Sequence, residues 1–174
     1  MYELSYYETM AEYNAWMNRK LYRVCADVPD ELRKKDLGAF FGSIHGTLNH
    51  LLLADLVWFG RFTGQPPQAK ALNQELYSGF DELRREREAM DLRILDWTRA
   101  LSRQRLGEPF TYTSLSDHKT RTRPFWVLVV HLFNHQTHHR GQLTTLLTQL
   151  RLDYGVTDLP WLPNLCELDP AEAE

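Results

Sequence analysis

Four of the seven histidines in this chain fall within nine residues, at His131, His135, His138 and His139. Because each residue turns an α-helix by about 100°, residues four apart share a face, and His135 and His139 would lie one above the other. Two imidazoles in this arrangement can bind one metal ion together. The same spacing of three and four is continued on both sides by leucines, at Leu128, Leu132, Leu143, Leu146 and Leu150. The pair therefore takes positions where leucine would otherwise face the core.

Histidines on such a core stripe have two interpretations. An uncharged imidazole is costly to bury unless its ring nitrogens find partners. A metal ion would satisfy one nitrogen of His135 and one of His139, whereas hydrogen bonds to neighbouring groups would make both residues purely structural. The spacing favours the metal, and the sequence lacks the HExxH motif of zinc proteases because Gln136 follows His135.

A third ligand must come from another helix, and His50 is the best candidate. It shares a helical face with Ala54 and Val57, which are expected to point inward. His45 lies five residues earlier and should point elsewhere, and His118 is expected in an exposed loop. The predicted metal ligands are therefore His50, His135 and His139.

Four long segments with helical periodicity must position these side chains. They are expected at about Ser5–Val28, Ser43–Phe62 with Ser43 as N-cap, Asn73–Leu106, and Pro124–Arg151. Between them, a short stretch of about one helical turn that ends at Gly38 is expected, and a short extended piece at Phe110–Ser114. The expected fold class is all-α: a four-helix bundle forming a single domain over 1–174, with an irregular tail from about 152.

The composition is that of a globular protein, with 43% hydrophobic and 25% charged residues and a formal net charge of -3. This charge argues against a nucleic-acid partner, and we interpret the run Arg84-Arg85-Glu86-Arg87 as a solvated helix face. No apolar run is long enough to span a membrane, and no signal peptide is evident, so a cytoplasmic protein is expected. Cys25 and Cys166 lie in no motif and are interpreted as packing or incidental.

Longer strings of residues resemble the DinB family of metal-binding four-helix proteins. These strings stand at Tyr13–Asn18, Phe40–Leu52, Asn134–Gln142 and Asp153–Asp158, and the resemblance covers nearly the whole chain. The resemblance implies a DinB/YfiT-like bundle with a long crossover connection, often a homodimer. It also implies a three-histidine metal site with one ligand at His50 and an HxxxH pair at His135 and His139.

Three neutral imidazoles leave a divalent ion at least one open position, as in catalytic sites. Nitrogen ligands suit zinc or nickel best, with iron or manganese as alternatives. Relatives with this fold resemble thiol S-transferases, so the leading hypothesis is an enzyme that transfers a low-molecular-weight thiol to a small-molecule electrophile. The alternatives are a metal-dependent hydrolase and a non-catalytic, stress-associated metal-binding or interaction protein. The sequence does not identify the substrate.

Several neighbouring residues have two interpretations. His131 and His138 would either contact the site or lie exposed. Gln142, like Asn134, would either hydrogen-bond near the ligands or cover exposed helix surface. A structural salt bridge is favoured for Asp55. A glycine inside a helix costs roughly 1 kcal/mol, so close approach of another helix or subunit would explain Gly141.

Overall fold

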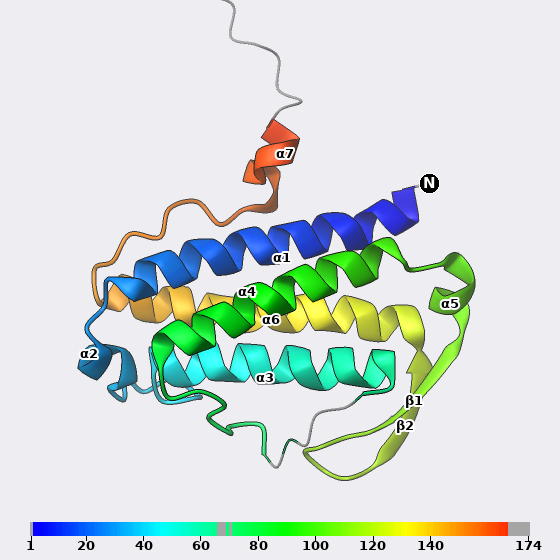
Figure 1. The fold of residues 1–174 in the computed structure, drawn as a ribbon, viewed down its shortest axis with the longest axis horizontal. Helices are drawn as coiled ribbons and strands as arrows, with labels where there is room; N and C mark the ends of the chain where they lie inside the picture. Colours follow the sequence, from blue (N-terminus) through cyan, green and yellow to red (C-terminus); the bar gives the residue numbers. More distant parts are fainter. Residues whose placement is uncertain (1, 66–68, 70, 167–174) are drawn as a thin grey trace, which may run out of the picture.

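The computed structural model describes residues 2–65, 69 and 71–166, and its main feature is a bundle of four long helices (Figure 1). These helices are α1 (Tyr2–Ala26), α3 (Ile44–Thr63), α4 (Phe80–Arg99) and α6 (Phe125–Gln149). The connections carry the short helices α2 (Asp30–Lys34) and α5 (Arg103–Gly107), the strands β1 (Pro109–Thr113) and β2 (Thr120–Pro124), and then η1 (Leu159–Trp161) and α7 (Pro163–Cys166). The predicted all-α four-helix bundle is confirmed.

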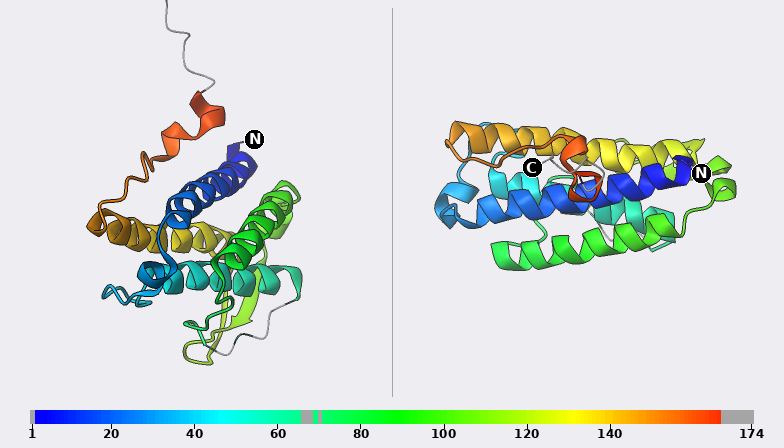
Figure 2. Two further views of the ribbon diagram at one scale, coloured as in Figure 1. Left: turned by 60° about the vertical axis from the view of Figure 1, so that its left-hand side comes forward. Right: turned by 90° about the horizontal axis from the view of Figure 1, so that it is seen from above.

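The direction of the helices reveals the crossover. Helices α1 and α6 run one way along the bundle, and α3 and α4 run the other way (Figures 1 and 2). Each of α1 and α3 packs against both α4 and α6. Because α3 and α4 are parallel neighbours, the segment 64–79 must return along the length of the bundle to join them. This is the long crossover connection that the resemblance implied.

The helix that carries His50 begins and ends as its sequence predicts. Ser43 precedes α3 in an extended conformation, and its hydroxyl accepts a hydrogen bond from the Gly46 amide at 3.0 Å. Gly64 follows the helix in the left-handed conformation, at φ 76°, where a side chain would be strained.

The third predicted helix was wrong at both ends. Residues 73–79 lie in the crossover segment, and α4 begins only at Phe80. The amides of Leu76 and Tyr77 donate to the side-chain oxygen of Asn49 instead of joining a helix, at 2.8 and 3.0 Å. At the other end α4 stops at Arg99, and Ser102 caps the separate helix α5.

The extended piece predicted near Phe110 is one strand of a hairpin whose second strand the sequence analysis missed. Strands β1 and β2 pair antiparallel, from Pro109 opposite Pro124 to Thr113 opposite Thr120. The two half-buried residues of β1, Phe110 and Tyr112, alternate with exposed threonines. The hairpin lies beside the end of α3, where the ring of Tyr112 meets the ring of Trp58 edge-on at 5.0 Å between centroids.

The last described residues run back along the outside of α1 (Figure 2). The Tyr13 hydroxyl donates to the Thr157 carbonyl at 2.6 Å, and the Leu162 side chain is buried in the core. The irregular tail thus packs against the bundle and contains the short helices η1 and α7. Among the described residues, no helix is both long and apolar enough to span a membrane.

A cluster of charged and polar side chains in the core connects all four long helices. Arg87 of α4 is 1% exposed, donates a hydrogen bond to Asp55 of α3 at 2.7 Å and forms an ion pair with Asp91 at 2.8 Å. Asn14 of α1 donates to Asp91 at 3.2 Å and accepts a hydrogen bond from Arg140 of α6. Two cations and two carboxylates balance, so the cluster is neutral. The salt bridge expected for Asp55 is confirmed, whereas the interpretation of Arg87 as part of a solvated face was wrong.

We expect Arg87→Met to lower the free energy of unfolding by about 3–5 kcal/mol, because it leaves two buried carboxylates without their cation. Urea unfolding followed by circular dichroism measures the change. The matched control is Arg84→Met on the same helix, where the side chain is 41% exposed. That control should change the stability by less than about 0.5 kcal/mol. Similar small losses in both variants would contradict the structural role of the cluster.

Candidate metal centre

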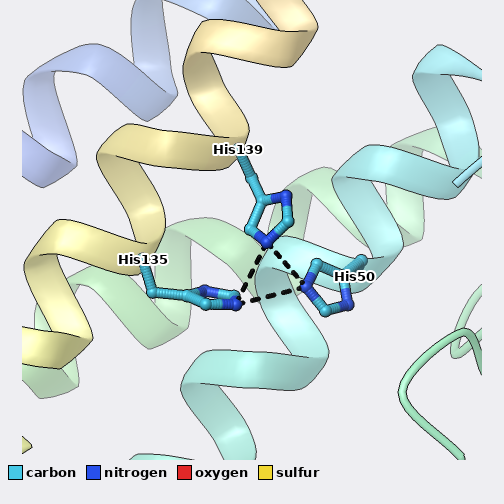
Figure 3. A group of neighbouring side chains, drawn as sticks. All are labelled: His50, His135 and His139. Carbon is cyan, nitrogen blue, oxygen red and sulfur yellow. Dashed lines mark hydrogen bonds between the residues drawn. The ribbon is translucent and has the colours of Figure 1, made fainter. Parts of the chain in front are cut away.

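The three predicted ligands converge from two helices. His50 comes from α3, His135 and His139 come from α6, and the Nε2 atoms of all three point to a common centre (Figure 3). The Nε2 atom of His50 lies 3.4 Å from that of His135 and 3.2 Å from that of His139, and the last two are 3.1 Å apart. The spacing argument thus singled out, from among seven histidines, the three that the structure brings together, and their role as metal ligands stays a prediction.

Hydrogen bonds fix which nitrogen of two rings faces the centre. His50 Nδ1 lies 2.8 Å from the Leu72 carbonyl, which can only accept, so Nδ1 carries the proton. His139 Nδ1 lies 2.9 Å from Gln142 Oε1, which likewise can only accept. Neutral rings held in this way present the Nε2 lone pair to the centre. Of the two interpretations of Gln142, the hydrogen bond near a ligand is confirmed.

The donor set fits a divalent metal ion. Two Nε2 lone pairs cannot hydrogen-bond to each other, so His50 and His139 would repel without a cation or proton between them. Zinc–nitrogen bonds of about 2.0–2.1 Å at tetrahedral angles place nitrogens about 3.3 Å apart. The three observed separations, 3.1 to 3.4 Å, match this value. The group could therefore hold a metal ion through three neutral imidazoles.

Burial keeps these imidazoles uncharged. It lowers the pKa of His50 to about 4, although the hydrogen bond to Leu72 opposes the shift. Burial also lowers the pKa of His135 to about 3, with further lowering by the imidazoles around it. The pKa of His139 is lowered by burial as well. At neutral pH all three rings are ready to bind a cation without first losing a proton.

Phe41 forms one wall of the centre. Its ring stacks on His50 with 3.7 Å between centroids and meets His139 edge-on at 5.4 Å. Gly46 permits this placement, because a Cβ atom there would lie 2.2 Å from the Phe41 carbonyl oxygen. The sequence analysis assigned no role to Phe41, and the glycine at the start of the helix is a signal from which a close backbone approach could have been inferred.

A cavity of about 210 Å³ lies beside the histidines. His50 and His135 line it, and so does His131, one helical turn before His135. Further lining residues come from α3, from the crossover segment and from the hairpin: Ala54, Val57, Trp58, Arg61, Leu72, Tyr112, Ser114, Leu115 and Ser116. A small molecule in this cavity would reach the point where the imidazoles converge.

The other four histidines lie in different environments. His131 takes part in the cavity wall and meets Trp58 edge-on at 5.0 Å. His138 is exposed; its ring meets that of His139 edge-on at 4.8 Å, and its Nε2 lies 3.4 Å from the Gln142 amide nitrogen. His45 is buried and donates to the Tyr77 carbonyl, and His118 is exposed, as expected for both. Each of these outcomes follows from helix phase or loop position.

Two other open interpretations are now resolved. Asn134 is exposed, so it covers helix surface and does not support the ligands. A Cβ atom on Gly141 would meet nothing within 4 Å of the described chain, so no helix of the same chain explains this glycine. The homodimer implied by the resemblance stays a prediction.

The cysteines do not contribute to the cavity wall that the structure describes. Cys25 is completely buried on α1, and burial raises the pKa of its thiol to about 12. Such a thiol is protonated and a poor nucleophile at neutral pH. The side chain of Cys166 lies outside the part of the chain that is described.

Fold and site together define a class, that of four-helix bundles with a candidate three-histidine metal centre. A family model described as DinB family matches residues 1–169, and the chain belongs to this family. It is 29% identical over 151 residues to Protein DinB of Bacillus subtilis (strain 168), covering 84% of this chain and 87% of that protein. The crystal structure of a DinB-like protein from Bacillus cereus ATCC 10987 superposes with a TM-score of 0.58 at 16% identity, covering 80% and 89% of the two chains. At that identity the likeness concerns the fold.

Protein purified without a histidine tag is expected to bind one equivalent of a divalent metal per chain, measured by elemental analysis after loading with zinc or nickel. In His50→Ala we expect affinity to fall by more than the roughly 10–100-fold that loss of a ligand's hydrogen-bond partner costs. His118→Asn, which removes an exposed histidine from the hairpin turn, is the matched control and should bind like the parent. Equal binding by all three proteins would place the metal elsewhere.

The metal-free protein should lose stability as the pH falls from about 6.5 toward about 4. In that range the imidazole of His50 is protonated in the unfolded chain but stays neutral in the folded one, so proton binding favours the unfolded state. Urea unfolding in EDTA at about pH 7.5 and about pH 5 tests this. The double variant His50→Leu/His135→Leu should lose less stability between the two pH values. An identical loss in parent and variant would show that these rings do not carry the effect.

Proposed function

We propose that this protein is a metal-dependent thiol S-transferase that joins a low-molecular-weight thiol to a small electrophile. The observation that carries the proposal is the position of the cavity. It leads to the point where three neutral imidazoles converge, and none of its described lining residues is a cysteine. A site with room for a substrate and no thiol of its own fits a reaction in which the nucleophile arrives as a cosubstrate.

In such a reaction the residues around the centre would have distinct roles. His50, His135 and His139 hold the ion, and the Leu72 carbonyl and Gln142 keep two of the rings in the correct tautomer. When bound, a divalent ion in this site would lower the pKa of a thiol and stabilise the thiolate.

The cavity would then position the electrophile against the thiol sulfur. Phe41, whose ring contacts His50 and His139, would shield these rings from water. In the transfer a sulfur–carbon bond forms and the bond between that carbon and its leaving group breaks. The thiol proton and the leaving group depart together to solvent, so the reaction needs no oxidant or reductant.

The test is turnover of metal-loaded protein with cysteine or coenzyme A as thiol and chlorodinitrobenzene as electrophile. We expect thiol consumption above the uncatalysed rate in the parent, and its loss in His135→Ala because one of three ligands is gone. Cobalt-loaded parent should also develop a sulfur-to-metal absorption band when thiol is added, a binding readout independent of turnover. His118→Asn again serves as the control.

Equal rates in the parent and in His135→Ala would overturn the transferase proposal. Hydrolysis of a nitrophenyl ester without thiol, lost in the same variant, would instead support the metal-dependent hydrolase. Metal binding with neither activity would leave the non-catalytic, stress-associated binding protein, the remaining alternative from the sequence.

A further inference from the structure

One end of the cavity carries a positive charge that the described residues do not neutralise. Arg61 lies on the same face of α3 as His50, three turns further along the helix, and lines the cavity. Its Nη2 atom donates to the Thr113 carbonyl at 2.7 Å. Within the described part of the chain, neither its hydrogen bond nor the charges that act on its pKa involve an aspartate or a glutamate.

Aromatic rings and the hairpin hold this guanidinium in place. It lies 4.7 Å from the ring centroid of Trp58 and 5.2 Å from that of Tyr112. Rings attract the cation but do not cancel its charge. Burial lowers the pKa of Arg61, and burial together with the nearby charge of Arg61 lowers the pKa of His131. A guanidinium has five N–H donors, and the Thr113 carbonyl takes one.

The walls around the charge restrict what can bind. No aspartate or glutamate is among the described residues that line the cavity. The wall between Arg61 and the histidines consists of Ala54, Val57 and Trp58. The volume of about 210 Å³ suits a small molecule and excludes a long peptide. A cation with free donors beyond an apolar wall is the arrangement that recognises a small organic anion.

We propose that Arg61 binds an anionic group of the substrate, a carboxylate or a phosphate, while the apolar wall of Ala54, Val57 and Trp58 receives a small hydrocarbon body. The reactive end of such a molecule points toward His50 and His135. That the anion is the substrate rests on the proposed function, whereas the anion site itself requires only the cavity. A purely structural Arg61, which pins the hairpin to α3, is the alternative that the experiment must exclude.

The probe is benzoate, compared with its neutral analogue benzamide, in calorimetric titrations of metal-free protein in EDTA. The chelator ensures that no carboxylate–metal contact is measured. We expect the parent to bind benzoate more tightly than benzamide, and Arg61→Gln to weaken benzoate binding by about tenfold or more, as loss of a charged hydrogen bond implies. Benzamide binding should change by less than about twofold. Phenyl phosphate in a parallel titration distinguishes the two anionic groups.

Two further variants separate recognition from folding. Arg61→Lys retains the charge without the planar fork and should recover part of the benzoate affinity. Arg99→Gln, an exposed arginine of α4, should bind like the parent. Near-ultraviolet circular dichroism of Arg61→Gln checks that the packing of Trp58 against Tyr112 persists.

The proposal is overturned if benzoate binds no better than benzamide, if neither binds, or if Arg61→Gln binds benzoate like the parent. Because every titration uses metal-free protein, these failures would leave thiol transfer at the histidines standing. Conversely, absence of transferase activity would leave the anion site intact.

Discussion

The ion pair between Arg87 and Asp55 imposes a constraint on the whole bundle, because a charge buried in the core must keep its partner. Asp91 shares the same guanidinium, and Asn14 connects Asp91 to Arg140, so the cluster includes side chains from all four long helices. A shift of α3 or α4 along its axis by one helical turn, or a rotation that moves its charged residue out of the core, would leave a buried charge unpaired, at a cost of several kcal/mol. Apolar packing alone tolerates such shifts more readily. The cluster therefore selects one register for the helices, including α3 and α6, which carry the histidines.

This register extends directly to the metal centre through residues adjacent to the ligands. Arg140 follows His139 in the sequence and belongs to the charged cluster. Gln136 follows His135, is fully buried, and donates to the carbonyl of Leu51, which follows His50, at 2.9 Å. Each ligand thus precedes a residue that is tied to another helix. A three-nitrogen site requires positions accurate to a few tenths of an ångström, and this arrangement supplies them before any ion binds.

The sequence predicted the parts of the structure that helical periodicity controls. His135 and His139 were found because leucines on both sides define the core stripe. The same reasoning would have placed Arg87 inside, since it stands at helical spacing between Leu83 and Met90, but its arginine neighbours suggested a solvated face. Because buried arginines are rare, Arg87 was interpreted from its residue type as exposed. Its spacing from Leu83 and Met90 indicated the core, and that indication was correct. Where a charged residue falls on an apolar stripe, a buried partner on another helix is the better expectation.

What periodicity does not control was not predicted, and much of the site depends on it. The Leu72 carbonyl that fixes the tautomer of His50 lies in the crossover segment. The side chain of Asn49 holds this segment against α3 through three hydrogen bonds to the backbone of Leu76 and Tyr77. Phe41 comes from the turn before α3. Loops follow no repeat, so their contacts emerge only in the folded chain. The helices thus determine where the nitrogens lie, whereas the crossover segment supplies the hydrogen bond that fixes the tautomer of His50, and the turn before α3 supplies Phe41.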